Sequence, residues 1–154
     1  MNVRRLLHGC VWIAGFLFVL DRIAKWLVIT HIAQPIPLTP FFYLDYAINR
    51  GISCGLFYFT DTVGFVVVSS IIAALLSAIM VWTWRVYQRG GLIIGQLLII
   101  SGGLSNLCDR VLFGGVVDYL GLHWGEWCFP LFNIADVAID VGVVILIVQN
   151  MAKK

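Results

Sequence analysis

The chain has 154 residues, of which 61% are hydrophobic and only 12% are charged, and its net charge is +2. Soluble domains contain about 25% charged residues, so this composition, with a mean hydropathy of +0.97, predicts an integral membrane protein. The length predicts a single domain over residues 1–154, and no basic cluster indicates a nucleic-acid partner.

Four apolar segments have the length of a membrane span, so we expect four transmembrane helices. They cover about residues 6–30, 62–84, 90–108 and 131–152. Basic residues flank these segments at three places, namely Arg4 and Arg5, Arg85 and Arg89, and Lys153 and Lys154. Because basic residues favour the cytoplasmic side, we expect both termini inside and the two longer loops, about residues 31–61 and 109–130, outside.

Two charged residues of the first span, Asp21 and Lys25, lie four positions apart and share one helix face. They form either a structural ion pair or a pair that orients a substrate or a neighbouring helix. Three prolines then exclude a helix, and the aromatic residues in 41–46 favour a short strand. In segment 49–51, the glycine permits either a structural turn or the close approach of a ligand.

Polar residues gather at the outer end of the third span. Segment 101–103 contains two glycines, which allow another backbone to approach closely. Asn106, Asp109 and Arg110 follow at helical spacing and are expected on one face. An Asp–Arg pair at a helix end would explain these residues without a functional role.

The second outer loop contains a turn signal and a short β-prone stretch. Two glycines and two valines in segment 114–117 predict a turn and an extended segment leading to Asp118. Pro130 is placed to begin the fourth helix. The two outer loops are therefore expected to form a small extracytoplasmic β-containing region on an otherwise all-α membrane protein.

The fourth helix is expected to place Asn133, Asp136 and Asp140 on one face. A carboxylate on so apolar a helix costs free energy in lipid, and it is therefore a functional candidate. At 1.5 Å rise per residue, Asp21, Asp109 and Asp136 each lie roughly 24–30 Å from the nearest cytoplasmic basic residues. Since the hydrocarbon core is about 30 Å thick, these acids are expected at its outer boundary.

Two carboxyl groups that share one proton can hydrolyse an amide. One activates water, and the other protonates the carbonyl oxygen or the leaving nitrogen. Their mutual repulsion separates the two pKa values and maintains the singly protonated state. Asp118 and Asp136 are eighteen residues apart and can meet if the loop folds back, although spacing alone also allows Asp109 or Asp140 as the partner.

The three histidines and four cysteines are scattered without metal-ligand spacing. We therefore expect no structural metal site. Cys54 and Cys128 could pair if their loops meet in an oxidising compartment, and the sequence leaves this question open.

Five short motifs, in order, resemble those of the lipoprotein signal peptidases, the bacterial signal peptidase II family of membrane aspartyl proteases. They are Asp21-x-x-x-Lys25, Asn49-x-Gly51, Asn106-x-x-Asp109-Arg110, Val116-x-Asp118-Tyr119 and Phe132-Asn133-x-Ala135-Asp136. The chain departs from the family pattern at Cys54, where an aromatic residue is common, and at Ser105, where glycine is usual. The first departure affects substrate contact, and the second is expected to affect only helix packing.

The resemblance implies that Asp118 and Asp136 are the catalytic pair. It also implies binding or supporting roles for Asn49, Gly51, Asn106, Asp109, Arg110, Asn133, Asp21 and Lys25. The implied substrate is a diacylglyceryl-prolipoprotein, cleaved just before its lipidated cysteine by a monomer that contacts membrane lipid. The resemblance implies no metal and no organic cofactor. The implied location is the bacterial inner membrane, with both termini cytoplasmic and the active site at the outer face.

The alternative is a small proton-coupled transporter that uses the same acids as relay groups. Such a protein would be expected to have charges near the bilayer midplane, and inverted repeats or broken helices. The predicted acids instead lie at one boundary, and the sequence contains no evident internal repeat.

Overall fold

The structure is a computed structural model that describes residues 3–51 and 61–152, with the backbone alone for residues 3–8. Cys54, Lys153 and Lys154 lie outside the described residues, as do the side chains of Arg4 and Arg5. The orientation that these basic residues predict, and the pairing of Cys54, are therefore not addressed by the structure.

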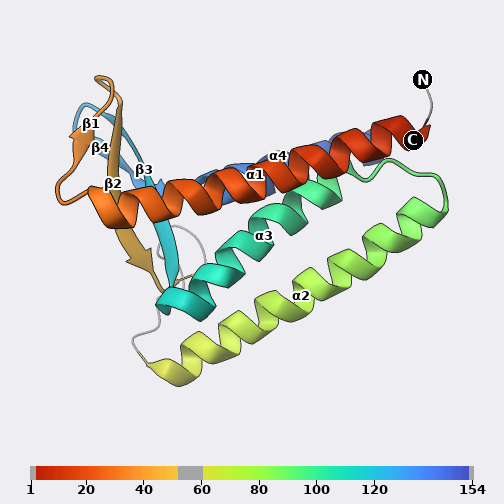
Figure 1. The fold of residues 1–154 in the computed structure, drawn as a ribbon, viewed down its shortest axis with the longest axis horizontal. Helices are drawn as coiled ribbons and strands as arrows, with labels where there is room; N and C mark the ends of the chain where they lie inside the picture. The colour runs from red at the N-terminus through yellow and green to blue at the C-terminus, as the bar shows by residue number, and fades with distance from the viewer. Residues whose placement is uncertain (1–2, 52–60, 153–154) are drawn as a thin grey trace.

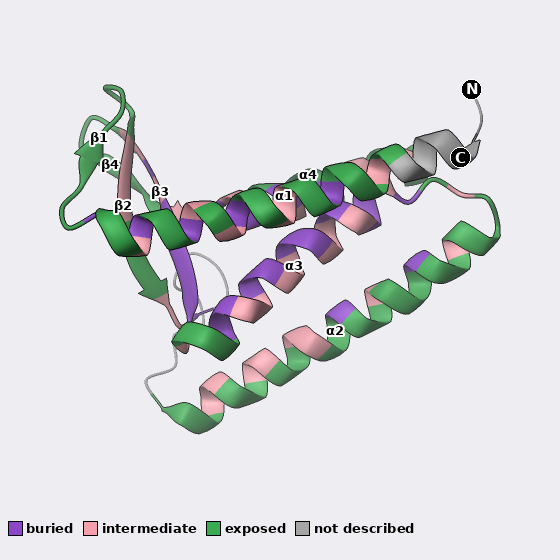
Figure 2. Ribbon diagram, in the orientation of Figure 1, coloured by how far each residue is buried: buried purple, intermediate pink, exposed green. Residues whose placement is uncertain are grey.

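Four helices make up most of the molecule (Figure 1). They are α1 (Val3–His31), α2 (Thr62–Gln88), α3 (Ile94–Phe113) and α4 (Ile134–Met151). The helix α3 is central, because it packs against each of the other three. In Figure 2 its buried residues contrast with α2, where only Leu76 and Thr83 are buried.

Two of these helices, α2 and α4, are long and apolar enough to cross a membrane. The other two carry fully buried charged residues, including Lys25 in α1 and Asp109 in α3. The sequence predicted a membrane span in each of the four helices. The length and composition of the helices support that prediction directly for α2 and α4.

The two long connections together form one antiparallel sheet in the order β1-β2-β3-β4, as the sequence predicted in outline. Its strands are β1 (Ile36–Pro37), β2 (Phe42–Asn49), β3 (Val116–Trp124) and β4 (Trp127–Phe132). The sheet lies at one end of the helices, whereas α1 begins and α4 ends at the other end, near the α2–α3 turn (Figure 1).

The strand β3 joins the sheet to the helices. Val117 and Tyr119 are buried with Val28 and Ile32 of α1 in one apolar cluster. Successive side chains of a strand point to opposite faces, so Asp118, between these two residues, faces away from α1. The packing of β3 on α1 thus directs Asp118 toward α3 and α4.

Two predicted boundaries were wrong. The helix α3 continues to Phe113, so Asp109 and Arg110 are helical and do not belong to the outer loop. Pro130 lies in β4, and α4 begins later, at Ile134. The reason is a capping box, in which Asn133 accepts from the backbone of Asp136 and Asp136 accepts from the backbone of Asn133.

Candidate active site

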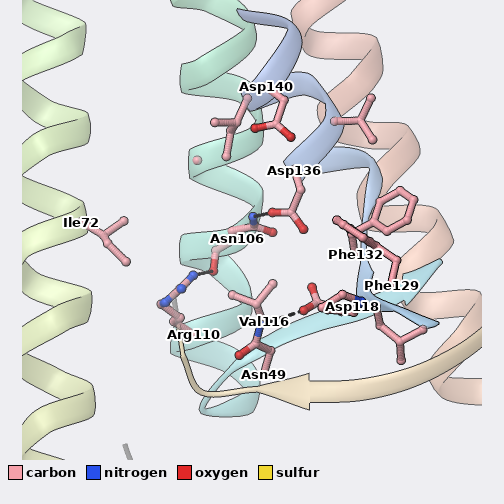
Figure 3. A pocket seen from close by; sticks show the side chains of 15 residues that line it. Asn49, Ile72, Asn106, Arg110, Val116, Asp118, Phe129, Phe132, Asp136 and Asp140 are labelled. Carbon is pink, nitrogen blue, oxygen red and sulfur yellow. Dashed lines mark hydrogen bonds between the residues drawn. The ribbon is translucent and has the colours of Figure 1, made fainter. Parts of the chain in front are cut away.

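A cavity of about 540 Å³ lies where β3 and β4 meet α3 and α4. Its polar lining comes from elements far apart in the sequence, as Figure 3 shows. The polar residues are Asn49, Asn106, Arg110, Asp118, Asp136 and Asp140. Most of the other lining side chains are apolar, including Ile72 of α2 and Phe132 of β4.

Asp118 enters the cavity from β3 and is almost completely buried. The Asn133 side chain donates to its Oδ1 at 2.7 Å, and the Asn49 side chain donates to its Oδ2 at 2.9 Å. Each carboxylate oxygen can accept a second hydrogen bond. Asp118 is therefore held in place by two amides while it keeps capacity for water or substrate.

Asp136 enters the same cavity from the first turn of α4. Asn106 donates from its side chain to Oδ1 at 2.8 Å, and the backbone N–H of Asn133 donates to Oδ2 at 3.2 Å. Asn133 thus contacts both acids, with its side chain on Asp118 and its backbone on Asp136. One residue spans the distance between the two carboxyl groups, which both face the cavity (Figure 3).

The environment of Asp118 favours its protonated form. The pKa of Asp118 is raised from 3.8 to about 6, chiefly by burial and also by the charge of Asp136. Hydrogen bonds from Asn49 and Asn133 and the charge of Lys25 act in the opposite direction. A carboxyl group with this pKa can exchange a proton near neutral pH.

Lys25 lies behind the cavity and is fully buried. Its ammonium group bonds Asp21 at 2.8 Å, Asp109 at 2.7 Å and the side-chain oxygen of Asn106 at 2.8 Å. These three acceptors match its three donors. Of the two interpretations left open for Asp21 and Lys25, this arrangement favours a structural ion pair. Asn106 connects that pair to Asp136, because it accepts from Lys25 and donates to Asp136.

Asp109 and Asn106 share the face of α3 that meets Lys25, as helical spacing predicted, but Asp109 does not line the cavity as Asn106 and Arg110 do. It is fully buried against α1, where it pairs with Lys25 and Arg22 and accepts from the backbone of Val117 at 3.1 Å. Asp109 is therefore already occupied by partners and does not line the cavity with Asp136.

Asp21 ties α1 to the three other elements around the site. Its carboxylate accepts from Ser105 of α3 at 2.6 Å, from the Tyr119 hydroxyl at 3.1 Å and from the backbone of Ala135 at 3.2 Å. Ser105 was expected to affect packing alone, but its hydroxyl donates directly to this buried acid.

Arg110 lines the cavity and also fixes the segment after β2. Its guanidinium donates to the backbone oxygen of Gly51 at 3.1 Å and to that of Asn106 at 3.2 Å. The backbone of Gly51 donates to the Asn49 side-chain oxygen at 2.8 Å. Gly51 therefore supports the site through its backbone.

The sequence did not single out Arg22, Ser105 or Tyr119 as part of this arrangement. Tyr119 could have been found from strand alternation, because it must face opposite to Asp118. For Arg22 and Ser105 no local signal exists, since their partners lie more than eighty residues away. Among residues 3–51 and 61–152, no group of three or more His, Cys, Asp or Glu side chains could hold a metal ion.

Comparisons with known proteins identify the family of this chain. The family model described as signal peptidase (SPase) II matches residues 13–152. The lipoprotein signal peptidase of Sphingopyxis alaskensis is 40% identical over 146 residues, which cover 90% of this chain and 82% of that protein. The lipoprotein signal peptidase of Yersinia enterocolitica is 35% identical over 145 residues, which cover 91% and 85%.

The fold also resembles a solved structure. A structure titled as a bacterial membrane enzyme aligns with a TM-score of 0.77 at 24% identity. The alignment covers 94% of this chain and 88% of that chain. At this level of identity the match establishes the shared fold.

Proposed function

The chain belongs to the signal peptidase II family, and from this premise we propose that Asp118 and Asp136 hydrolyse the bond between signal peptide and prolipoprotein. Its activity is that of a lipoprotein signal peptidase, an aspartic peptidase that cleaves signal peptides from prolipoproteins. Because the chain belongs to this peptidase family, the alternative of a proton-coupled transporter is rejected. The observation that carries the assignment of the pair is that Asn133 bonds both carboxyl groups in one cavity.

The proposed chemistry follows from a pair that holds one proton. The ionised carboxylate removes a proton from a water molecule, whose oxygen attacks the scissile carbonyl carbon. The protonated carboxyl donates its proton to the carbonyl oxygen, and a carboxyl then protonates the leaving nitrogen as the C–N bond breaks. Asn49, Asn106 and Asn133 keep both acids in position.

We further propose that all four helices cross the bilayer and that the sheet lies at its outer surface. The apolar side chains of α2 are largely exposed, as expected for a helix that faces lipid. Trp124 and Trp127 are exposed on the sheet, and tryptophan is enriched at membrane–water interfaces. Both termini would then be cytoplasmic, and the scissile bond, just before the lipidated cysteine, would lie at the outer face of the bacterial inner membrane.

The test is cleavage of a purified diacylglyceryl-modified preprotein by Asp118→Asn and Asp136→Asn variants. Each should cut at least roughly 10³-fold more slowly than the wild type, because an amide cannot exchange the required proton. Asp45→Asn is the matched control, since Asp45 lies on β2 outside the cavity. Thermal unfolding in detergent should show that all three variants fold, and near-normal cleavage by either cavity variant would refute the assignment.

A further inference from the structure

A third carboxyl group lines the cavity and has no role in the proposed chemistry. Asp140 lies four residues after Asp136 on α4, one helical turn further from the sheet. In Figure 3 it follows Asp136 along the same wall of the cavity. Any substrate segment that enters the cavity beside the dyad therefore passes this group.

Asp140 is exposed and has no partner within the described part of the chain, where no hydrogen bond or ion pair reaches it. Asp118 and Asp136 each accept two hydrogen bonds from asparagines. Val137 and Ile139, which line the cavity from the same helix, are apolar, and so is Ile72 of α2. A carboxyl group without a partner in apolar surroundings is unfavourable, so its hydrogen-bonding capacity is available to a ligand.

The chemistry of the substrate indicates which ligand group this is, an argument that rests on the proposed function. A peptide bond inside a helix is shielded, so the segment before the scissile bond must unwind to reach the dyad. Its backbone N–H groups then lose their helical acceptors, and lipid offers no replacement. Ester-linked acyl chains contribute acceptors alone, which leaves the peptide N–H groups as the donors for a carboxylate.

We propose that Asp140 binds the substrate by accepting a hydrogen bond from a backbone N–H on the signal-peptide side of the scissile bond. One helical turn is about 5.4 Å, and an extended chain rises about 3.3 Å per residue. The bonded N–H therefore belongs to the residue about two positions before the scissile bond. Because the contact is with the backbone, it anchors signal segments of differing sequence.

The experiment uses synthetic lipidated substrates in which one amide near the scissile bond is replaced by an ester, which removes a single N–H. We expect the ester at about the second residue before the cut to lower kcat/KM of the wild type about tenfold. With Asp140→Leu, the same ester should change kcat/KM less than about twofold, because the acceptor is already absent. On the all-amide substrate, Asp140→Leu should itself lose about tenfold.

Two controls separate this contact from a general change in the helix. Val141 is exposed on α4 and lies outside the cavity. In Val141→Leu the ester should therefore lower kcat/KM by the same factor as in the wild type. Asp140→Asn retains an acceptor oxygen and should recover part of the lost activity.

The inference is overturned if the ester lowers kcat/KM by the same factor in the wild type and in Asp140→Leu. It is also overturned if the ester leaves kcat/KM of the wild type unchanged. It is also overturned if Asp140→Leu abolishes cleavage as fully as Asp136→Asn, because Asp140 would then belong to the catalytic pair. Failure of the proposed function is a separate result, namely near-normal cleavage of the all-amide substrate by Asp118→Asn or Asp136→Asn.

Discussion

Three asparagines determine how the two carboxyl groups of the proposed catalytic pair are presented. The side-chain oxygen of Asn106 accepts from Lys25, so its nitrogen must face Asp136. The oxygen of Asn133 accepts from the backbone of Asp136, so its nitrogen must face Asp118. A side-chain amide has an oxygen that accepts and a nitrogen that donates. Once its oxygen accepts a hydrogen bond from one neighbour, its nitrogen is turned toward the other neighbour as a donor. Both acids therefore receive hydrogen-bond donors from these amides.

The Asn49→Ala variant tests this arrangement through its pH–activity profile. The pKa of Asp118 is about 6, because burial raises it and the hydrogen bond from Asn49 partly opposes that rise. Without that bond the ionised form loses stabilisation, so the pKa of Asp118 rises further. The limb of the profile that depends on Asp118 should move to higher pH.

The control is Asn150→Ala at the far end of α4, which should leave the profile unchanged. A profile of Asn49→Ala that stays in place, or moves to lower pH, would contradict the role given to Asn49. The shift is read from kcat/KM between about pH 4 and 9, the range that brackets the Asp118 pKa.

At the residue scale the sequence identified the acids and asparagines of the cavity but not all of their support. Motif spacing and the resemblance together placed Asn49, Asn106, Asp118, Asn133 and Asp136. Helical spacing correctly predicted that Asn106 and Asp109 share a face, because both bond Lys25 on α1. Spacing could not predict that Asn106 also reaches the cavity whereas Asp109 does not.

At the scale of elements, α1 and α3 are joined by a buried charged cluster, which we define as Asp21, Arg22, Lys25 and Asp109. Lys25 is fully buried, as are both carboxylates. Removing one partner from such a cluster leaves an uncompensated buried charge. The cluster therefore holds α1 in place behind the cavity that contains Asp118 and Asp136.

Lys25→Met should lower the free energy of unfolding by about 3–5 kcal/mol, because it leaves Asp21 and Asp109 short of a cation. Arg22→Met should lower the free energy of unfolding less. The Arg22 side chain is 22% exposed, and Asp109 keeps its ion pair with Lys25 in this variant. Thermal or denaturant unfolding in detergent measures both. Equal losses in the two variants would be inconsistent with a central role for Lys25.

The close contact of α3 with α4 depends on a glycine, which has no side chain. A Cβ at Gly102 would overlap the backbone carbonyl of Ala135, one residue before Asp136. A Cβ at Gly103 would instead meet Leu76 Cδ1 at 2.9 Å, at the flexible end of a side chain that can move. The sequence predicted a close backbone approach at segment 101–103, and the structure confirms it at Gly102.

We expect Gly102→Ala to lower the free energy of unfolding by about 1–3 kcal/mol and to reduce kcat, because it pushes the first turn of α4 away from α3. Gly103→Ala, one residue along the same helix, is the matched control and should affect both quantities less. Unfolding and single-turnover cleavage should be measured on the same preparations. A Gly102→Ala variant as stable and active as Gly103→Ala would count against this close contact.

Element boundaries were the least predictable feature of the fold. The hydrophobic pattern located the four helices, but the end of α3, where Asp109 and Arg110 are buried, and the start of α4 depend on tertiary partners. Asp109 and Arg110 remain helical because each finds acceptors or donors on other elements. The start of α4 is set at Asn133 by its capping box, three residues after Pro130.

On the scale of the whole molecule, the sheet and the helices each supply one acid of the proposed catalytic pair. β3 carries Asp118, α4 carries Asp136, and the cavity exists only where the two meet. The sequence predicted helices and a β-containing region from the two long loops. It could not predict strand register, which decides that Asp118 lies opposite Ala47, two residues before Asn49. That register brings Asn49 within hydrogen-bonding distance of Asp118.

The central claim is that the two acids act as a single unit, and single-turnover cleavage by Asp118→Asn, Asp136→Asn and the double variant tests it most directly. Residues that act as a unit are strongly non-additive. We expect each single variant to lose at least roughly 10³-fold and the double variant to lose little more than either. A single variant that retains near-normal turnover, or a double variant whose loss is the product of the two, would contradict the account.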